Sequence, residues 1–411
     1  MTPATSGTVE FRGVDVVFGR RPAEALRLLD AGLDRAEIQE RTGHVVGVAG
    51  ASLTVREGEV CVLMGLSGSG KSTLLRCVNG LNRATRGEVL VSTPDGPVDA
   101  AGCDPRSLRR LRTRTTAMVF QQFALLPWRT VAENVGLGLE LQGVPRRERA
   151  RVVDEKLAMV GLERWRDART HQLSGGMQQR VGLARAFALD APVLLMDEPF
   201  SALDPLIRAR LQDELLDLQH RLRKTIVFVS HDLDEAMKIG NRIAIMEEGR
   251  IVQHGTPEEI ALAPANGYVA DFVAHMNPVN VLRCASIMTP LDALARRGGA
   301  LLAEADTGTT LVLDAGGAVV SAHAEGYGPL PVAALADAGQ GGGQGAGLGE
   351  PAPSVRTVVT VPPDLTLREA MEIRRRSDAP IVVAADGKAL GVVGNRELYG
   401  AVLGRPAATE A

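Results

Sequence analysis

One stretch of the sequence decides the fold: Val60-Cys61-Val62-Leu63-Met64, followed by Gly65-Leu66-Ser67-Gly68-Ser69-Gly70-Lys71-Ser72-Thr73. The first five residues predict a buried strand, and Leu74-Leu75-Arg76 predicts that a helix follows the glycine-rich loop. Such a loop turns successive backbone N–H groups toward one anion, beside the positive end of the helix dipole. Lys71 would neutralise the β- and γ-phosphates of a nucleotide, and the Ser72 hydroxyl would bind Mg²⁺. The stretch therefore predicts an α/β fold with a phosphate-binding loop.

A second apolar strand ends in two carboxylates, in the run Val193-Leu194-Leu195-Met196-Asp197-Glu198. A magnesium–nucleotide site needs one acid for the metal and another to orient the attacking water, and Asp197 and Glu198 suit these two roles. An acidic strand end taken alone is more often solvated surface. Beside a phosphate-binding loop, the catalytic interpretation is favoured.

A third element, Leu173-Ser174-Gly175-Gly176-Met177-Gln178, places a Ser-Gly-Gly turn at the start of an amphipathic helix. By its spacing alone this turn is an ordinary helix cap made by Ser174. Together the three elements resemble the ATP-binding cassette (ABC) family, whose signature sequence Leu173 to Gln178 matches. The resemblance covers Val9 to about His275. It implies a cassette over residues 1–278, with a RecA-like core and a helical subdomain at 122–172.

The resemblance also implies the residues of an ATP and Mg²⁺ site that is shared between two copies of the chain. Gln121 would contact the metal and the water, and His231 would bind the γ-phosphate, although either residue alone could be structural. Asp204 lies in the loop that crosses the dimer interface in this family. The implied set contains, for ATP, Phe18, Gly65, Leu66, Ser67, Gly68, Ser69, Gly70, Lys71, Ser72 and Thr73; for Mg²⁺, Ser72, Gln121 and Asp197; for catalysis, Glu198, His231, Gln121 and Lys71; and in trans, Ser174, Gly175, Gly176 and Gln178.

Phe18 is the candidate aromatic residue for stacking on adenine, but it stands 65 − 18 = 47 residues before Gly65, farther than most of the family places it. The excess is the segment 22–43, which predicts two short helices broken at Gly32. Both the insertion at this point and the sequence of residues 64–73 resemble those of ATPases of the glycine betaine/proline/choline import group. Within that group the chain looks most like the choline-import ATPases.

Trp128 follows Gln121 in the segment where importers of this family dock their permease. A tryptophan beside Pro127 fits a docking surface, and a place in the core of the helical subdomain is the equal alternative. The resemblance implies a homodimer around two ATP molecules, integral-membrane permease subunits and, indirectly, a periplasmic or lipid-anchored binding protein.

The remainder of the chain predicts a different α+β region. Two weakly similar units, 279–337 and 355–404, flank a glycine-rich linker at 338–354 and precede a tail at 405–411. Each unit contains a β-hairpin signal, and the second reads as strand, helix, hairpin and helix. They resemble a pair of CBS modules, of which the first is degenerate. A sensor of ionic strength, nucleotide or membrane charge and an inert or dimerising tail are both compatible with this pattern.

The composition of the 411 residues is that of a globular protein, with 45% hydrophobic and 23% charged residues and a net charge of −3. This balance argues against nucleic acid as a partner. No apolar run is long enough to cross a bilayer, so we expect a peripheral subunit at the cytoplasmic face of the cell membrane. The predicted function is ATP hydrolysis that drives uptake of choline or a related quaternary amine. Glycine betaine or proline import and a non-transport ABC ATPase are the alternatives.

Overall fold

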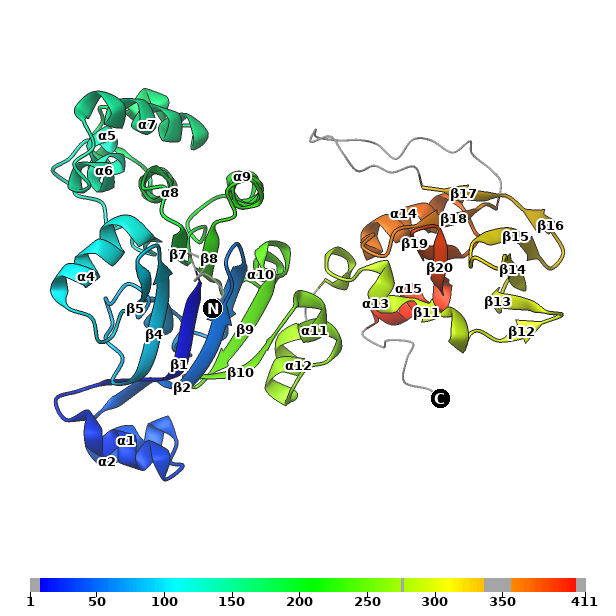
Figure 1. Ribbon diagram of the computed structural model, residues 1–411, viewed down its shortest axis with the longest axis horizontal. Coiled ribbons are helices and arrows are strands. Elements are labelled where there is room, and N and C mark those ends of the chain that lie inside the picture. Colours follow the sequence, from blue (N-terminus) through cyan, green and yellow to red (C-terminus); the bar gives the residue numbers. More distant parts are fainter. Residues whose placement is uncertain (1–7, 275–276, 336–355, 404–411) are drawn as a thin grey trace. The chain divides into compact units, whose positions relative to one another are not determined.

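The structure is a computed structural model that describes residues 8–274, 277–335 and 356–403 (Figure 1). It divides into unit 1, residues 1–260 with 265–269, and unit 2, residues 261–264 with 270–411. The boundary predicted at residue 278 is therefore several residues too late. Ala261 and Leu262 pack against the apolar core of unit 2, which moves the boundary toward the N-terminus.

The central element of unit 1 is a six-stranded sheet in the order β10-β9-β3-β8-β7-β6. Its strands are β3 (Val60–Met64), β6 (Thr116–Val119), β7 (Val193–Asp197), β8 (Thr225–Val229), β9 (Arg242–Glu247) and β10 (Arg250–Gly255). All neighbours pair in parallel except β9 and β10. Every residue of β3, β6, β7 and β8 is buried, as expected for parallel strands covered on both faces. The loops that follow these four strands consequently lie at one edge of the sheet.

A second, antiparallel sheet of unit 1 has the order β2-β1-β4-β5. Its strands are β1 (Val9–Phe18), β2 (Val45–Val55), β4 (Arg86–Thr93) and β5 (Gly96–Asp99). Phe11 and Val89 of this sheet share one apolar core with Leu63 of β3 and with Leu74 and Leu75 of helix α3 (Lys71–Leu75). This core anchors both ends of the glycine-rich loop.

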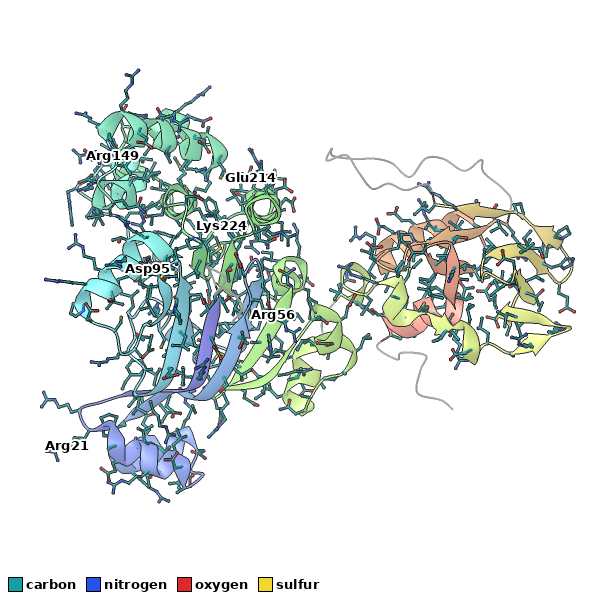
Figure 2. All side chains as sticks on the ribbon, in the orientation of Figure 1. Arg21, Arg56, Asp95, Arg149, Glu214 and Lys224 are labelled. Atoms are coloured by element: carbon teal, nitrogen blue, oxygen red, sulfur yellow. The ribbon has the colours of Figure 1, made fainter. Side chains whose placement is uncertain are left out.

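Residues 22–43 form the predicted two-helix insertion. Helix α1 (Pro22–Asp30) ends before Gly32, and helix α2 (Arg35–Thr42) begins after a capping box made by Asp34 and Glu37. The insertion is the loop of a β-hairpin, because Phe18 at the end of β1 pairs with Val45 at the start of β2. Arg21 marks its exposed start (Figure 2).

The predicted helical subdomain, residues 122–172, contains helices and no strand. Its elements are α5 (Val131–Val135), α6 (Leu137–Leu141), α7 (Arg146–Met159) and the 3₁₀ turns η2 (Glu163–Trp165) and η3 (Thr170–Gln172). The rest of unit 1 consists of α4 (Pro105–Arg110), the π-helical turn η1 (Leu111–Thr115), α8 (Gly175–Ala188), α9 (Pro205–Leu222), α10 (Leu233–Ile239), most of α11 (Pro257–Leu262) and the start of α12 (Gly267–Val273).

Unit 2 begins with short elements that pack onto a mixed sheet of order β11-β20-β19-β18-β17. The elements are η4 (Pro278–Asn280), α13 (Cys284–Ile287), β11 (Thr289–Pro290), η5 (Leu291–Ala293), β17 (Val332–Ala334), β18 (Val358–Val361), α14 (Leu367–Arg376), β19 (Ile381–Ala385), β20 (Lys388–Val393) and α15 (Asn395–Val402). Residues 358–402 therefore have the predicted order of strand, helix, hairpin and helix.

The segment 279–337 does not have this order, which corrects the expectation of two similar units. It contains a five-stranded antiparallel sheet of β12 (Arg296–Arg297), β13 (Ala300–Glu304), β14 (Thr309–Leu313), β15 (Val319–Ala324) and β16 (Gly328–Leu330). The predicted β14–β15 hairpin is present. The turns of three to five residues after β13, β14 and β15 leave no room for a helix, and Gly308, Gly317 and Gly326 adopt positive φ there.

A buried polar cluster lies inside unit 2. The side chains of Glu304 on β13 and Arg374 on α14 are each 6% exposed, and Arg374 Nη2 donates to Glu304 Oε1 over 2.9 Å. Arg374 Nη2 also donates to Asn395 Oδ1, and the backbone N–H of Asn395 donates to Glu304. This Glu304–Arg374–Asn395 cluster links residues far apart in the chain.

The predicted linker 338–354 and tail 405–411 lie outside the described residues. Among the helices that the structure does describe, none is long and apolar enough to cross a membrane.

Candidate nucleotide-binding site

The glycine-rich loop connects the fully buried β3 to α3, as predicted. Gly65 and Gly70 have φ of 142° and 101°, and a Cβ at either position would collide with the backbone carbonyl of Met246 or Gly47 respectively. Only glycine fits these two positions. The loop is thereby held closely against neighbouring strands, with its N–H groups before a helix N-terminus.

Lys71 is almost fully buried inside this loop. Its Nζ donates to the carbonyl oxygens of Gly65 at 2.8 Å and of Leu66 at 2.9 Å. Burial lowers the pKa of Lys71, and the charges of Glu198 and Asp197 partly oppose this shift. A phosphate group at the loop would satisfy the ammonium better than these neutral carbonyls, since charge-assisted pairs are stronger.

Asp197, the last residue of β7, is completely buried and faces α3. Its Oδ1 accepts from Ser72 Oγ at 2.7 Å, and its Oδ2 accepts from Arg76 Nη2 at 2.9 Å. A serine hydroxyl and a carboxylate this close provide the hard oxygen ligands that Mg²⁺ prefers, so the residues present fit this metal. Arg76 was missed by the sequence analysis, although its position one helical turn after Ser72 placed it on the same face.

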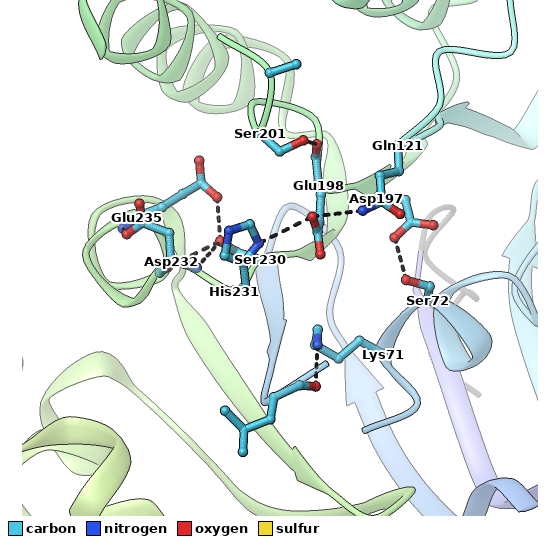
Figure 3. Close-up of polar contacts among 12 residues, drawn as sticks. Lys71, Ser72, Gln121, Asp197, Glu198, Ser201, Ser230, His231, Asp232 and Glu235 are labelled. Atoms are coloured by element: carbon cyan, nitrogen blue, oxygen red, sulfur yellow. Dashed lines mark hydrogen bonds and ion pairs between the residues drawn. The ribbon is translucent and has the colours of Figure 1, made fainter. Parts of the chain in front are cut away.

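Glu198 follows Asp197 and contacts two more of the predicted site residues, Gln121 and His231. Its Oε2 accepts from Gln121 Nε2 at 3.0 Å and lies 3.3 Å from His231 Nδ1 (Figure 3). Glu198 has a φ of 47°, a left-handed conformation that non-glycine residues rarely adopt. Gln121, Glu198 and His231 follow β6, β7 and β8, so the strand order brings them together at one edge.

The loop that carries His231 is held in place by hydrogen bonds to the buried Glu235. Ser230 Oγ donates to the Glu235 carboxylate and accepts from the N–H of Asp232, and Gln212 Nε2 donates to Glu235 at 3.1 Å. Burial raises the pKa of Glu235. The imidazole of His231 itself is 62% exposed, so it can contact a ligand above the loop.

Phe18 lies at the loop despite its distance in sequence. Its ring covers Gly47, where a Cβ would come within 2.7 Å of Phe18 Cε2 and 3.1 Å of the Thr73 methyl group. Phe18 is 45% exposed. The β1–β2 hairpin explains the long spacing, because the 22–43 insertion leaves and returns at the same place.

The structure does not bring the signature segment to the phosphate-binding loop of the same chain: between the two segments, both fully described, it contains no hydrogen bond. Ser174 caps α8, and its Oγ accepts from Met177 N–H at 3.4 Å. Gly175 has open space around it. Gln178 donates to the carbonyls of Thr170 and Leu173, so it supports the turn.

The loop between β7 and α9 is tied to the signature helix. Asp204 caps α9 by accepting from Ile207 N–H. Gln179 Nε2 donates to the Glu198 carbonyl, and Gln179 Oε1 accepts from Ala202 N–H. This role of Gln179 cannot be recognised from sequence, because an amide on a helix carries no signal of its own.

The comparisons with known proteins agree with this geometry. Residues 48–201 match the family model described as ABC transporter. The chain is 48% identical over 300 residues to the glycine betaine/proline betaine transport system ATP-binding protein ProV of Salmonella typhimurium, covering 70% of this chain and 74% of that protein. It is 42% identical to the glycine betaine/carnitine transport ATP-binding protein GbuA of Listeria monocytogenes, covering 92% and 93%.

A solved structure resembles unit 1. The dimeric, ADP- and Pi-bound ATP-binding cassette MJ0796 in a post-hydrolysis state is 31% identical, with a TM-score of 0.52. The match covers 61% of this chain and 98% of that one.

Proposed function

We infer the function from one premise: the chain belongs to the family of ABC transporter ATP-binding subunits for glycine betaine and related quaternary amines. It hydrolyses ATP to drive uptake of such an amine. One observation carries this proposal: beside the phosphate-binding loop, Gln121 and His231 both contact the same carboxylate oxygen of Glu198. It supplies a base and its orienting groups where a γ-phosphate would end.

In the proposed mechanism, residues 65–73 bind the phosphates through backbone N–H groups, and Lys71 exchanges its two carbonyl partners for phosphate oxygens. Ser72, Asp197 and Gln121 hold Mg²⁺, which when bound neutralises charge on the phosphates. The Glu198 carboxylate accepts the proton of the attacking water. His231 and Gln121 fix the orientation of that carboxylate. The half-exposed ring of Phe18 covers one face of the adenine.

The second part of the proposal is that two chains enclose each ATP. The open surroundings of Gly175 and the N-terminus of α8 support a role for Ser174, Gly175, Gly176 and Gln178 in trans. Asp204, at the start of α9, would line the same interface. The dimeric state of the similar cassette MJ0796 is in line with this arrangement.

The partner in the membrane would be a permease that contacts the helical subdomain. Trp128 is 68% exposed, which disagrees with a place in the core and favours a docking surface. Substrate recognition would reside in the permease and in a separate binding protein. The chain itself would act at the cytoplasmic face of the membrane.

Choline is the substrate that we propose from the sequence. Glycine betaine is the second candidate, and the names of ProV and GbuA favour it. Cells that lack the gene should recover uptake of labelled choline when they receive wild type, with excess glycine betaine and proline as competitors. The pattern of competition ranks the substrates.

Two variants test the role of the chain in that assay. Glu198→Gln should not restore uptake. Glu57→Gln is the matched control, because Glu57 is exposed and precedes β3 at the opposite edge of the sheet. Uptake that never depends on the gene, or that Glu198→Gln fully restores, would contradict the proposed function.

A further inference from the structure

The two-helix insertion has a fixed position beside the phosphate-binding loop. Ala25, Leu29 and Ile38 of the insertion form an apolar cluster with Val17 of β1 and Val46 of β2. Its attachment strand also touches the loop directly, because the carbonyl of Gly47 closely approaches Gly70. The insertion is thus packed onto the strands that support the site, and the start of α2 is set by that packing.

Arg35, the first residue of α2, reaches the loop itself. Its Nη1 donates to the carbonyl oxygen of Gly68 over 3.0 Å, a contact between residues 33 positions apart. The backbone leading to Arg35 is well defined, since Asp34 accepts from Glu37 N–H and Glu37 accepts from Asp34 N–H. Arg35 is half-buried, and it lies outside every nucleotide-binding motif of the sequence.

The direction of this hydrogen bond matters for anion binding. A loop that presents its N–H groups to an anion turns carbonyls outward, and Gly68 adopts a positive φ of 81° within that loop. A donor on an outward carbonyl therefore supports the binding conformation without competing for the ligand. Arginine suits this place because its guanidinium stays charged and can donate several hydrogen bonds.

We propose that Arg35 is a positioning residue of the ATP site, which holds the phosphate-binding loop in its anion-binding conformation from the insertion. This inference rests on the proposed binding of ATP at residues 65–73. It gives segment 22–43 a specific role, because the insertion then acts as a brace for the loop. The effect of this brace falls on nucleotide affinity rather than on the hydrolytic step.

The test compares variants of the full-length chain. Arg35→Met keeps an aliphatic stem and removes the donors, Arg35→Lys keeps one donor and the charge, and Arg41→Ala is the matched control. Arg41 is an exposed arginine on the same helix, and no hydrogen bond or ion pair of its side chain is described. Titration with a fluorescent ATP analogue gives Kd, steady-state hydrolysis gives KM and kcat, and thermal unfolding monitors folding.

Arg35→Met should raise the Kd for ATP roughly three- to tenfold, the range expected when one ordinary protein hydrogen bond is lost. Its kcat at saturating ATP should stay within about twofold of wild type, and Arg35→Lys should recover most of the affinity. An unchanged Kd in Arg35→Met, or an equal loss in Arg41→Ala, overturns the inference. If wild type itself fails to bind ATP, the proposed function fails, and the brace fails with it.

Discussion

The two units solve the problem of grouped charges in opposite ways. At the strand-end site of unit 1, Glu198 and His231 sit on loops, and His231 is largely exposed. In the Glu304–Arg374–Asn395 cluster of unit 2, both charged side chains are 6% exposed and neutralise each other. The first arrangement leaves groups available for a ligand, whereas the second uses them internally. Grouped charges are therefore a sign of chemistry only where they remain accessible.

The largest expected effect breaks the chemistry of unit 1 alone. Glu198→Gln should lower kcat for ATP by about 10²- to 10⁴-fold, because the amide cannot accept the proton of the water. ATP binding and unit 2 should be unaffected, and an ATP-bound dimer should accumulate. Colorimetric phosphate release measures kcat, and size-exclusion chromatography with ATP detects the dimer. Undiminished turnover would remove Glu198 from its assigned role.

The next effect breaks unit 2 and spares the chemistry. Arg374→Met leaves Glu304 buried without its cation and should reduce the unfolding free energy of unit 2 by about 3–5 kcal/mol. The double variant Glu304→Met, Arg374→Met should lose less than this single variant, since no charge stays unpaired. The cluster is accessory if the single variant unfolds like wild type.

Tryptophan fluorescence separates the two units in that experiment. The chain has two tryptophans, Trp128 and Trp165, and both lie in unit 1. In Arg374→Met, the unfolding transition of unit 1 detected by tryptophan emission should keep its midpoint denaturant concentration. Circular dichroism should show that unit 2 unfolds at a lower denaturant concentration than in wild type. ATP hydrolysis per folded unit 1 should stay within about twofold.

The smallest expected effect is a pH dependence of stability in unit 1, which contains the half-buried His254. Burial, with the adjacent cation of Arg242, lowers the pKa of His254 in unit 1 below 6.5, and Glu259 opposes this shift only in part. The unfolded chain then binds this proton more readily than the folded chain, so stability present above pH 6.5 is lost as the pH falls through and below 6.5.

His254→Gln should flatten this acid loss, because glutamine has no proton to gain and its oxygen can still accept from Arg242 Nε. Urea unfolding followed by tryptophan emission between pH 7.5 and 5 provides the measurement. A wild-type profile retained in the variant would assign the acid loss to other groups.

Much of the strand-end site could be predicted because its residues follow strands directly in sequence. Asp197 ends one buried strand, Glu198 follows it directly and His231 follows the neighbouring strand, so parallel pairing alone brings them together. Phe18 was harder, since only the β1–β2 register shows that the insertion returns to its starting point.

Contacts made by long side chains across many residues could not be predicted. The Arg35–Gly68 hydrogen bond and the Glu304–Arg374 pair, 70 residues apart, depend on packing that no local pattern encodes. The expected similarity of 279–337 to 355–404 was wrong for a related reason. A hairpin signal at residues 310–316 was correct, but it did not reveal that tight turns continue on either side.

The left-handed backbone of Glu198 has a consequence for how substitutions at this position would be selected. Glycine adopts a φ of 47° without strain and asparagine with little, so Glu198→Gly and Glu198→Asn should raise cellular abundance. A library sorted by expression level would enrich these two alleles, and the same library grown on transport-dependent medium would discard them. Position 198 is thus a place where maps of abundance and of fitness should have opposite signs.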